Sequence, residues 1–169
     1  MSQVDISIII PIFNEEDSIN DLYDELLNSI PHDLEYEIIF VNDGSQDNSS
    51  KKIKSIILED KRVKLVDFFI NGGKSESLNL GFKKSSGNII LTLDGDLQDD
   101  PSEIKNLINQ INSGSDMVTG WKKNRKDPLS KRVLSKIFNF TLRLITGLKI
   151  HDFNCGLKAY KKHVIKSVN

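Results

Sequence analysis

The sequence of 169 residues is poor in cysteine and has no surplus of either charge. Its single thiol, Cys155, cannot form an internal disulfide, which argues against a disulfide-stabilised secreted scaffold. We expect Cys155 to be a small packing residue. The 23 basic and 24 acidic residues give a formal net charge of −1. Overall charge therefore gives no indication of a nucleic-acid partner.

Long apolar runs are also missing. No apolar segment reaches the roughly 18 residues that a membrane-spanning helix needs. The N-terminus has no basic stretch and leads directly into a strand pattern, which is unlike a signal peptide. We therefore expect a cytoplasmic protein, with peripheral contact to a membrane surface left open.

Two common nucleotide-binding motifs are absent. The turn after the first expected strand has no glycine, whereas a dinucleotide site needs G-x-G-x-x-G there. Residues 68–75 resemble the end of a Walker A loop, but Phe68 stands where that loop requires glycine. Gly73 and Lys74 still form a candidate anion site at the start of a helix. The alternative for Lys74 is a solvated surface side chain.

Strand-like and helix-like segments alternate along the chain. Short β-branched apolar runs predict strands at residues 6–13, 37–41, 63–69, 88–93 and 116–120. Apolar residues at helical spacing predict helices at residues 17–30, 53–57, 75–86 and from 101 onward. This alternation indicates an α/β fold, a mostly parallel central sheet with helices on both faces. In such sheets ligands bind beyond the carboxyl ends of the strands.

Two carboxylates follow the fourth expected strand. Asp94 and Asp96 are two residues apart, so both can face one cation. Oxygen ligands suit Mg²⁺ or Mn²⁺, with substrate phosphates in the remaining positions. Gln98 can supply another oxygen, and Gly95 lets the backbone approach a ligand closely.

A solvated acidic turn is the alternative for this pair. Asp99 and Asp100 are expected to cap a helix that begins at Pro101. An EF-hand loop does not fit, because Asp99 and Lys105 stand where it needs glycine and glutamate. Phosphatases of the haloacid dehalogenase type carry Asp-x-Asp on their first strand, whereas here three strand–helix units precede it.

Polar residues also follow the first two strands. Phe13 can stack on a nucleobase, and Glu15 can accept a hydrogen bond from it or only stabilise the following helix. Glu16 is expected to stabilise the first turn of that helix. Asp43 either closes an Asx turn or holds a base or ribose. Asp47 is expected to cap the next helix.

Five short motifs occur in order at these strand ends and near the C-terminus. They are Pro11-x-x-Asn-Glu-Glu, Val41-Asn-Asp-Gly-Ser, Asn71-Gly-Gly-Lys, Leu93-Asp-Gly-Asp-Leu-Gln and Asp152-Phe-Asn-Cys-Gly-Leu-Lys. Over nearly the whole chain, the sequence resembles glycosyltransferase family 2, especially its dolichyl- or polyprenyl-phosphate sugar transferases. This resemblance implies the GT-A fold.

The resemblance also implies roles for individual residues. It implies that a UDP- or GDP-sugar is bound by Pro11, Phe13, Glu15, Val41, Asp43, Lys74, Asp94, Gly95, Lys122 and Arg132. It implies metal ligation by Asp94, Asp96 and Gln98, with Asp96 and Asp152 as the catalytic residues. Lys122 departs from the pattern, because many family members have arginine there, and Arg125 is a candidate to compensate.

The implied activity is inverting transfer of a sugar to a polyprenyl phosphate, either dolichyl or undecaprenyl. A saccharide hydroxyl is the alternative acceptor, and a catalytically silent nucleotide-sugar-binding module is the alternative of another class. A hydroxyl acceptor needs Asp152 as a general base. A lipid phosphate is already anionic, with a second pKa of about 6, so Asp152 then only orients it.

The expected organisation is a single domain over residues 1–169. Residues 1–120 form its nucleotide-sugar-binding part, and residues 121–169 form an appended, acceptor- and membrane-proximal part. Within the latter, residues 131–149 carry an apolar stripe with a basic rim, which suits either a core or a membrane surface at its cytosolic face. Relatives of this type usually continue beyond Asn169, which leaves a C-terminal truncation open.

Overall fold

The computed structural model describes residues 4–120, 141, 144, 145, 147, 152 and 155–168. Its strands are β1 (Ile6–Ile12), β2 (Tyr36–Asn42), β3 (Val63–Asp67), β4 (Ile89–Thr92), β5 (Met117–Thr119) and β6 (Lys158–Lys161). Its helices are α1 (Ile19–Ser29), α2 (Ser49–Glu59), α3 (Lys74–Lys84), the 3-10 turn η1 (Pro101–Glu103), α4 (Ile104–Asn112) and α6 (Lys162–Val168).

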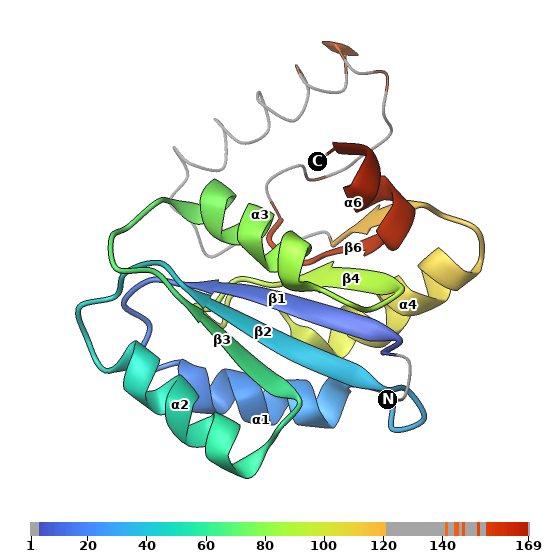
Figure 1. Ribbon diagram of the computed structural model, residues 1–169. Helices are drawn as coiled ribbons and strands as arrows, with labels where there is room; N and C mark the ends of the chain where they lie inside the picture. The colour runs from blue at the N-terminus through green and yellow to red at the C-terminus, as the bar shows by residue number, and fades with distance from the viewer. Residues whose placement is uncertain are drawn as a thin grey trace.

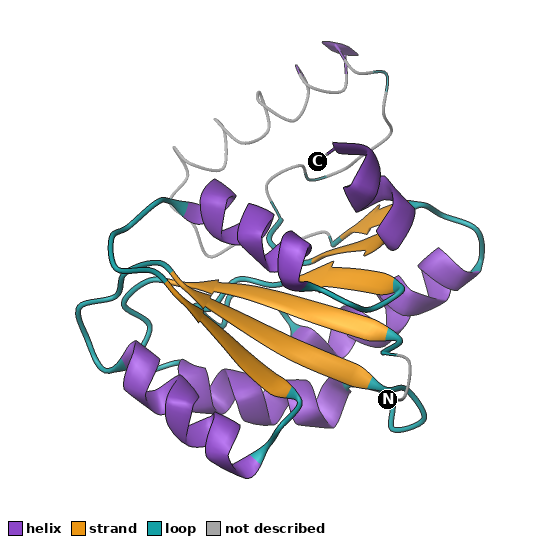
Figure 2. Cartoon of the chain, in the orientation of Figure 1, coloured by secondary structure: helices purple, strands orange, loops and turns teal. Residues whose placement is uncertain are grey.

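The six strands form one sheet in the order β3-β2-β1-β4-β6-β5, with helices above and below it (Figures 1 and 2). The strands β1 to β4 run parallel to one another, whereas β6 is antiparallel to both β4 and β5. The predicted α/β class, with a mostly parallel central sheet and helices on both faces, is confirmed.

Side chains of β1 alternate between two apolar clusters, because successive residues of a strand face opposite sides of the sheet. Ile8, Ile10 and Ile12 belong to the larger cluster, which also contains buried residues of α1, α2 and α4. Ile9 belongs to the smaller cluster, against which α3 packs and to which α6 contributes Ile165. β1 is thus buried on both faces, which explains its nearly continuous isoleucine run.

The position of β6 was not predicted. β6 lies between β4 and β5, where Ala159 pairs with Leu91 on one side and Val118 on the other. Ala159 is the one fully buried residue of this strand, so the segment has no apolar run that would mark it as a central strand. Residues 155–168 therefore belong to the central sheet and its cover rather than to an appended region.

No helix among the described residues is long and apolar enough to cross a membrane.

A buried carboxylate ties β1, β2 and β3 together near their amino ends. Glu37 is 2% exposed. Its Oε1 accepts hydrogen bonds from Ser7 Oγ at 2.6 Å and from the Ser86 amide at 2.7 Å, and its Oε2 pairs with Lys64 Nζ at 2.5 Å. Burial raises the pKa of Glu37, but the bonds from Lys64, Ser7 and Ser86 outweigh it and lower the pKa to about 2.

We expect Glu37 to make the protein sensitive to acid. Its pKa is lower in the folded state than the ordinary value of 4.5, so its contribution is complete above about pH 4.5 and is lost as the pH falls towards 2. The shift corresponds to about 3 kcal/mol of unfolding free energy. Urea unfolding of wild type and Glu37→Gln between pH 7 and pH 2 should show wild type losing its stability advantage over this range. Substitution of the exposed Glu35 by Gln is the control. If the unfolding free energies of wild type and Glu37→Gln fell by the same amount between pH 7 and pH 2, the assignment would be contradicted.

Candidate active site

A cavity of about 310 Å³ opens where β1, β2 and β4 end. Its walls come from the loops that follow β1, β2, β3 and β4, because the carboxyl ends of parallel strands meet at one edge of a sheet. It is lined by Pro11, Ile12, Phe13, Glu15, Asp43, Asn71, Gly73, Lys74, Asp94, Gly95 and Asp96. Most of the predicted nucleotide- and metal-binding residues are therefore brought together.

The loops after β1 and β2 are joined by side chains that bond to each other's backbone. In the loop after β1, the backbone turns at Asn14, which has a left-handed φ of +55°. Two residues later, the Glu16 carboxylate accepts hydrogen bonds from the Asn48 amide and from Asn48 Nδ2, both at 2.8 Å. The prediction that Glu16 stabilises its own helix is wrong, because its carboxylate bonds to the residue that precedes α2. Asp47 accepts a hydrogen bond from the amide of Ser49, the first residue of α2, although Asn48 occupies the N-cap position of that helix.

Glu15 lies in the loop between β1 and α1 and lines the cavity. Its amide donates to Ser49 Oγ at 3.0 Å. Burial raises the pKa of Glu15, and the nearby carboxylates of Asp96 and Asp94 raise it further. Ser18 Oγ lies 2.6 Å from the Gly95 carbonyl oxygen and 3.2 Å from Glu15 Oε2, which ties the start of α1 to the turn after β4.

Asp43 fixes the glycine-rich loop after β3. Its two carboxylate oxygens accept hydrogen bonds from the amides of Gly72 and Gly73, at 2.7 and 2.9 Å. Of the two roles considered for Asp43, an Asx turn is therefore not the one its carboxylate plays; the turn after β2 is instead bonded by Asn42, whose Oδ1 accepts from the Ser45 amide at 3.3 Å. Asp43 is buried but still lines the cavity. It therefore holds the loop at Gly72 and Gly73 in place and also contributes to the cavity surface.

Asp94 and Asp96 lie at the end of β4 as predicted, although their environments differ. Asp94 is partly buried, and its Oδ1 pairs with Lys74 Nζ at 2.5 Å. Asp96 is exposed, and its Oδ1 accepts from the Gln98 amide at 3.1 Å. The Gln98 side chain is exposed and does not line the cavity.

The next two carboxylates have separate roles. Asp100 accepts from the Ser102 amide at 3.0 Å and caps η1, as predicted. Asp99 is buried, and its Oδ2 accepts from the Asp94 amide at 3.2 Å. Its predicted capping role is therefore wrong, since Asp99 supports the turn that carries Asp94.

Gly156 lies directly against the Asp94 carboxylate. A Cβ atom at Gly156 would stand closer than 3.0 Å to three side-chain atoms of Asp94. Thr92 Oγ1 donates to the Gly156 carbonyl oxygen at 2.8 Å and holds this segment beside β4. Gly156 is part of a sequence motif, but only the structure shows why a glycine stands there. The pairing of β4 with β6 brings it so close to Asp94 that no side chain would fit.

The remaining predicted residues lie elsewhere. Val41 is fully buried in the smaller apolar cluster and does not line the cavity. Asp152 is 2% exposed, and its carbonyl oxygen accepts from Thr119 Oγ1 at 3.0 Å. Cys155 is buried in the larger cluster, which confirms its expected packing role. The predicted Lys122 and Arg132, as well as Arg125, lie outside the described residues.

The described residues that line the cavity carry excess negative charge, because Glu15, Asp43, Asp94 and Asp96 occur there with a single cation, Lys74. Within the described part of the chain, no group of three or more His, Cys, Asp or Glu side chains is placed to hold a metal ion. The described residues would therefore supply two carboxylates, Asp94 and Asp96, and substrate phosphates and water could occupy further positions. Mg²⁺ and Mn²⁺ suit this arrangement, since Mg²⁺ usually binds one or two carboxylates plus phosphate oxygens.

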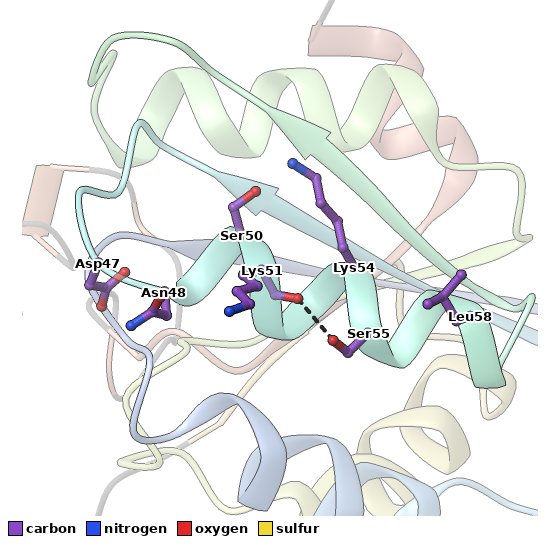
Figure 3. Close-up of a pocket in the computed structure, with 7 residues that line it drawn as sticks. All are labelled: Asp47, Asn48, Ser50, Lys51, Lys54, Ser55 and Leu58. Carbon is purple, nitrogen blue, oxygen red and sulfur yellow. Dashed lines mark hydrogen bonds between the residues drawn. The ribbon is translucent and has the colours of Figure 1, made fainter.

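A second hollow, of about 480 Å³, follows the exposed surface of α2 (Figure 3). It is lined by Asp47, Asn48, Ser50, Lys51, Lys54, Ser55 and Leu58. These residues all belong to α2 or directly precede it, and Lys54 is already paired with Asp67 at 3.0 Å. This hollow contains none of the predicted site residues, so the cavity at the strand ends is the candidate active site.

Solved structures with the same fold define the class of this protein. The mannosyltransferase PcManGT from Pyrobaculum calidifontis, in complex with GDP-Man and Mn²⁺, matches with a TM-score of 0.75 and 19% identity, covering 100% of this chain and 48% of that chain. Glucosyl-3-phosphoglycerate synthase from Mycobacterium tuberculosis, in complex with Mn²⁺, UDP-glucose and phosphoglyceric acid, matches with a TM-score of 0.73 and 18% identity. The match covers 95% of this chain and 57% of that chain. The fold is that of the GT-A glycosyltransferases.

The family model described as "Glycosyl transferase family 2" matches residues 7–168, so the chain belongs to this family. The undecaprenyl-phosphate 4-deoxy-4-formamido-L-arabinose transferase of Proteus mirabilis is 34% identical over 165 residues, which cover 96% of this chain and 51% of that protein. The dodecaprenyl-phosphate galacturonate synthase of Rhizobium johnstonii is 34% identical over 174 residues, which cover 99% of this chain and 51% of that protein. The chain spans about half the length of these curated relatives.

The contact between Gly156 and Asp94 predicts a specific loss of metal binding. In Gly156→Ala, the added methyl group displaces the Asp94 carboxylate, so we expect Mn²⁺ affinity in the presence of UDP or GDP to fall about tenfold or more. Isothermal titration calorimetry measures this directly. In the control Gly114→Ala, the Cβ has free space but φ is +118°, so this variant should lower Tm without changing binding. Equal Mn²⁺ affinities of Gly156→Ala and wild type would contradict the assignment.

Proposed function

We propose that this chain is the catalytic part of an inverting, metal-dependent glycosyltransferase that moves a sugar from a UDP- or GDP-sugar to a polyprenyl phosphate. The cavity at the strand ends carries this proposal, because four loops bring an aromatic ring, carboxylates and a lysine to one hollow. The names of the two curated relatives, both polyprenyl-phosphate sugar enzymes, support the acceptor. The GDP-Man and UDP-glucose complexes of the structural neighbours support the donor.

The donor nucleotide would lie along the first two strand ends. Phe13 is 47% exposed although it lines the cavity, so its ring is accessible for stacking on a base. Glu15 and Asp43 supply acceptors for the base or the ribose hydroxyls. Pro11 lines the same wall, whereas the buried Val41 would contribute through its backbone alone.

The diphosphate would lie between the ends of β3 and β4. Asp94 and Asp96 would hold the metal, and Gln98 is close enough in sequence to add an oxygen. A bound Mg²⁺ or Mn²⁺ supplies positive charge that neutralises the leaving nucleoside diphosphate. Lys74, together with Lys122 and Arg132 outside the described residues, would bind phosphate oxygens.

Transfer breaks the bond between the anomeric carbon and the diphosphate oxygen while an acceptor oxygen attacks from the opposite face, which inverts the configuration. A polyprenyl phosphate is already anionic near neutral pH, so its attack requires no general base. The strong burial of Asp152 suits a residue that orients the acceptor-binding segment. We therefore favour a lipid phosphate over a saccharide hydroxyl.

Polyprenyl phosphates are membrane lipids, so we place the chain at the cytosolic face of a membrane in peripheral contact with it. Most of the basic, apolar segment at residues 131–149 lies outside the described residues. Two of its described members support the contact, because Leu144 and Ile145 are helical and are 77% and 74% exposed. Exposed apolar side chains beside basic residues suit a lipid surface.

We expect Asp96→Asn to keep the fold and to lose sugar transfer. Substitution of groups that merely support a metal ligand costs 10- to 100-fold, so loss of a ligand should cost roughly 100-fold or more. Transfer of radiolabelled sugar from UDP- and GDP-sugars to undecaprenyl phosphate with Mn²⁺ measures this. Asp100→Asn is the matched control, because asparagine caps η1 as well as aspartate does.

Three outcomes would contradict parts of this proposal. Wild-type activity of Asp96→Asn, with the metal still required, would refute the role of Asp96. Transfer to saccharides but not to undecaprenyl phosphate would refute the lipid acceptor. Binding of UDP or GDP with Mn²⁺, but transfer to neither acceptor, would indicate a binding module.

We also expect the double variant Leu144→Ser/Ile145→Ser to bind anionic phosphatidylglycerol vesicles about tenfold more weakly than wild type, because two apolar contacts with the lipid are removed. Co-sedimentation with the vesicles measures the binding. Leu58→Ser on α2 removes a leucine that is equally exposed, at 76%, and should leave the binding unchanged. Equal losses in both variants, or no binding by wild type, would contradict the membrane contact.

A further inference from the structure

Lys74 is paired with one of the two proposed metal ligands. Its Nζ lies 2.5 Å from Asp94 Oδ1, although the two residues are 20 positions apart in the sequence. Lys74 is the first residue of α3, and Asp94 follows β4. Among the described residues that line the cavity, Lys74 is the only cation, so it neutralises part of their surplus negative charge.

Protein covers one side of the Asp94 carboxylate, because Gly156 lies directly against it. Asp94 also lines the cavity, so a cation can reach it from there, where Lys74 Nζ already stands beside Oδ1. Two cations on one carboxylate repel each other strongly at the separations of a partly buried site.

Lys74 is able to move away from Asp94. Its side chain is 54% exposed, compared with 23% for Asp94. Apart from its chain neighbours, no described residue comes within 4 Å of the position that a Cβ of the preceding Gly73 would take, so the backbone at the start of α3 is open on that side. A lysine has a compact charge on a flexible stem, and it binds phosphate as readily as it binds a carboxylate.

We propose that Lys74 is an internal counter-ion that competes with the divalent cation for Asp94 and is transferred to a phosphate oxygen when the donor binds. This proposal rests on the proposed function and deepens it. The metal alone binds weakly, because it must displace Lys74 while nothing else neutralises the released ammonium. Metal and diphosphate together bind well, because the diphosphate then becomes the partner of Lys74. Lys74 thereby couples the binding of the two ligands.

The substitution Lys74→Met distinguishes this role, because it should change the two affinities in opposite directions. Without the competing ammonium, Mn²⁺ alone should bind about 3- to 10-fold more tightly than it binds wild type. UDP or GDP at saturating Mn²⁺ should bind about tenfold more weakly, because a phosphate contact is lost. Isothermal titration calorimetry measures both affinities. Lys74→Arg, which keeps the charge, should restore weak Mn²⁺ binding.

The control Lys83→Met removes an exposed charge from the last turn of the same helix and should change neither affinity. Unchanged Mn²⁺ binding by Lys74→Met, with weaker nucleotide binding, would mean that Lys74 is a phosphate ligand only and would overturn the proposal. Loss of both affinities, or no Mn²⁺ binding by either protein, would also overturn it. If neither UDP nor GDP binds wild type, the proposed donor is wrong, while the comparison with Mn²⁺ alone still tests the competition.

Discussion

β1 pairs in parallel with β2 on one side and with β4 on the other, and the cavity depends on this arrangement. The hydrogen bonds continue past the ends of the neighbouring strands, since the Asp43 amide donates to Ile12 and the Leu93 amide donates to Ile9. Three separate turns are thereby held at one edge of the sheet. The side chains of β1 are buried on both faces, so the apolar cores that stabilise the fold also fix the relative positions of these turns.

Much of this arrangement could be predicted from the sequence. Strand-like and helix-like patterns alternate, and a parallel sheet places the turn after each strand at the same edge. This pattern is sufficient to predict that Phe13, Glu15, Asp43, Asp94 and Asp96 lie close together. The prediction succeeds because burial of β1, β2 and β4 leaves a clear apolar signal, and because polar residues closely follow these strands.

The roles of several carboxylates could not be predicted, because a sequence does not show which amide a side chain will meet. Glu16 and Asp99 both lie shortly before a helix, but the Glu16 carboxylate accepts from the Asn48 amide and the Asp99 carboxylate accepts from the Asp94 amide. Val41 matches a motif, yet alternation along β2 turns its side chain into the core. β6 was missed for a related reason, since its place in the sheet comes from pairing with β4 and β5 rather than from its own apolar content.

The position of β6 has a consequence for synthesis on the ribosome. Residues up to 120 emerge first and include β1 to β5, but β5 is joined to the sheet only through β6. Until residues 158–161 emerge, the nascent chain exposes the unpaired edge of β4, which is the kind of surface that chaperones protect from aggregation. Until then, the turn that carries Asp94 also lacks its contact with Gly156. Ligand-binding competence is therefore expected only after the C-terminal residues of this chain have been translated.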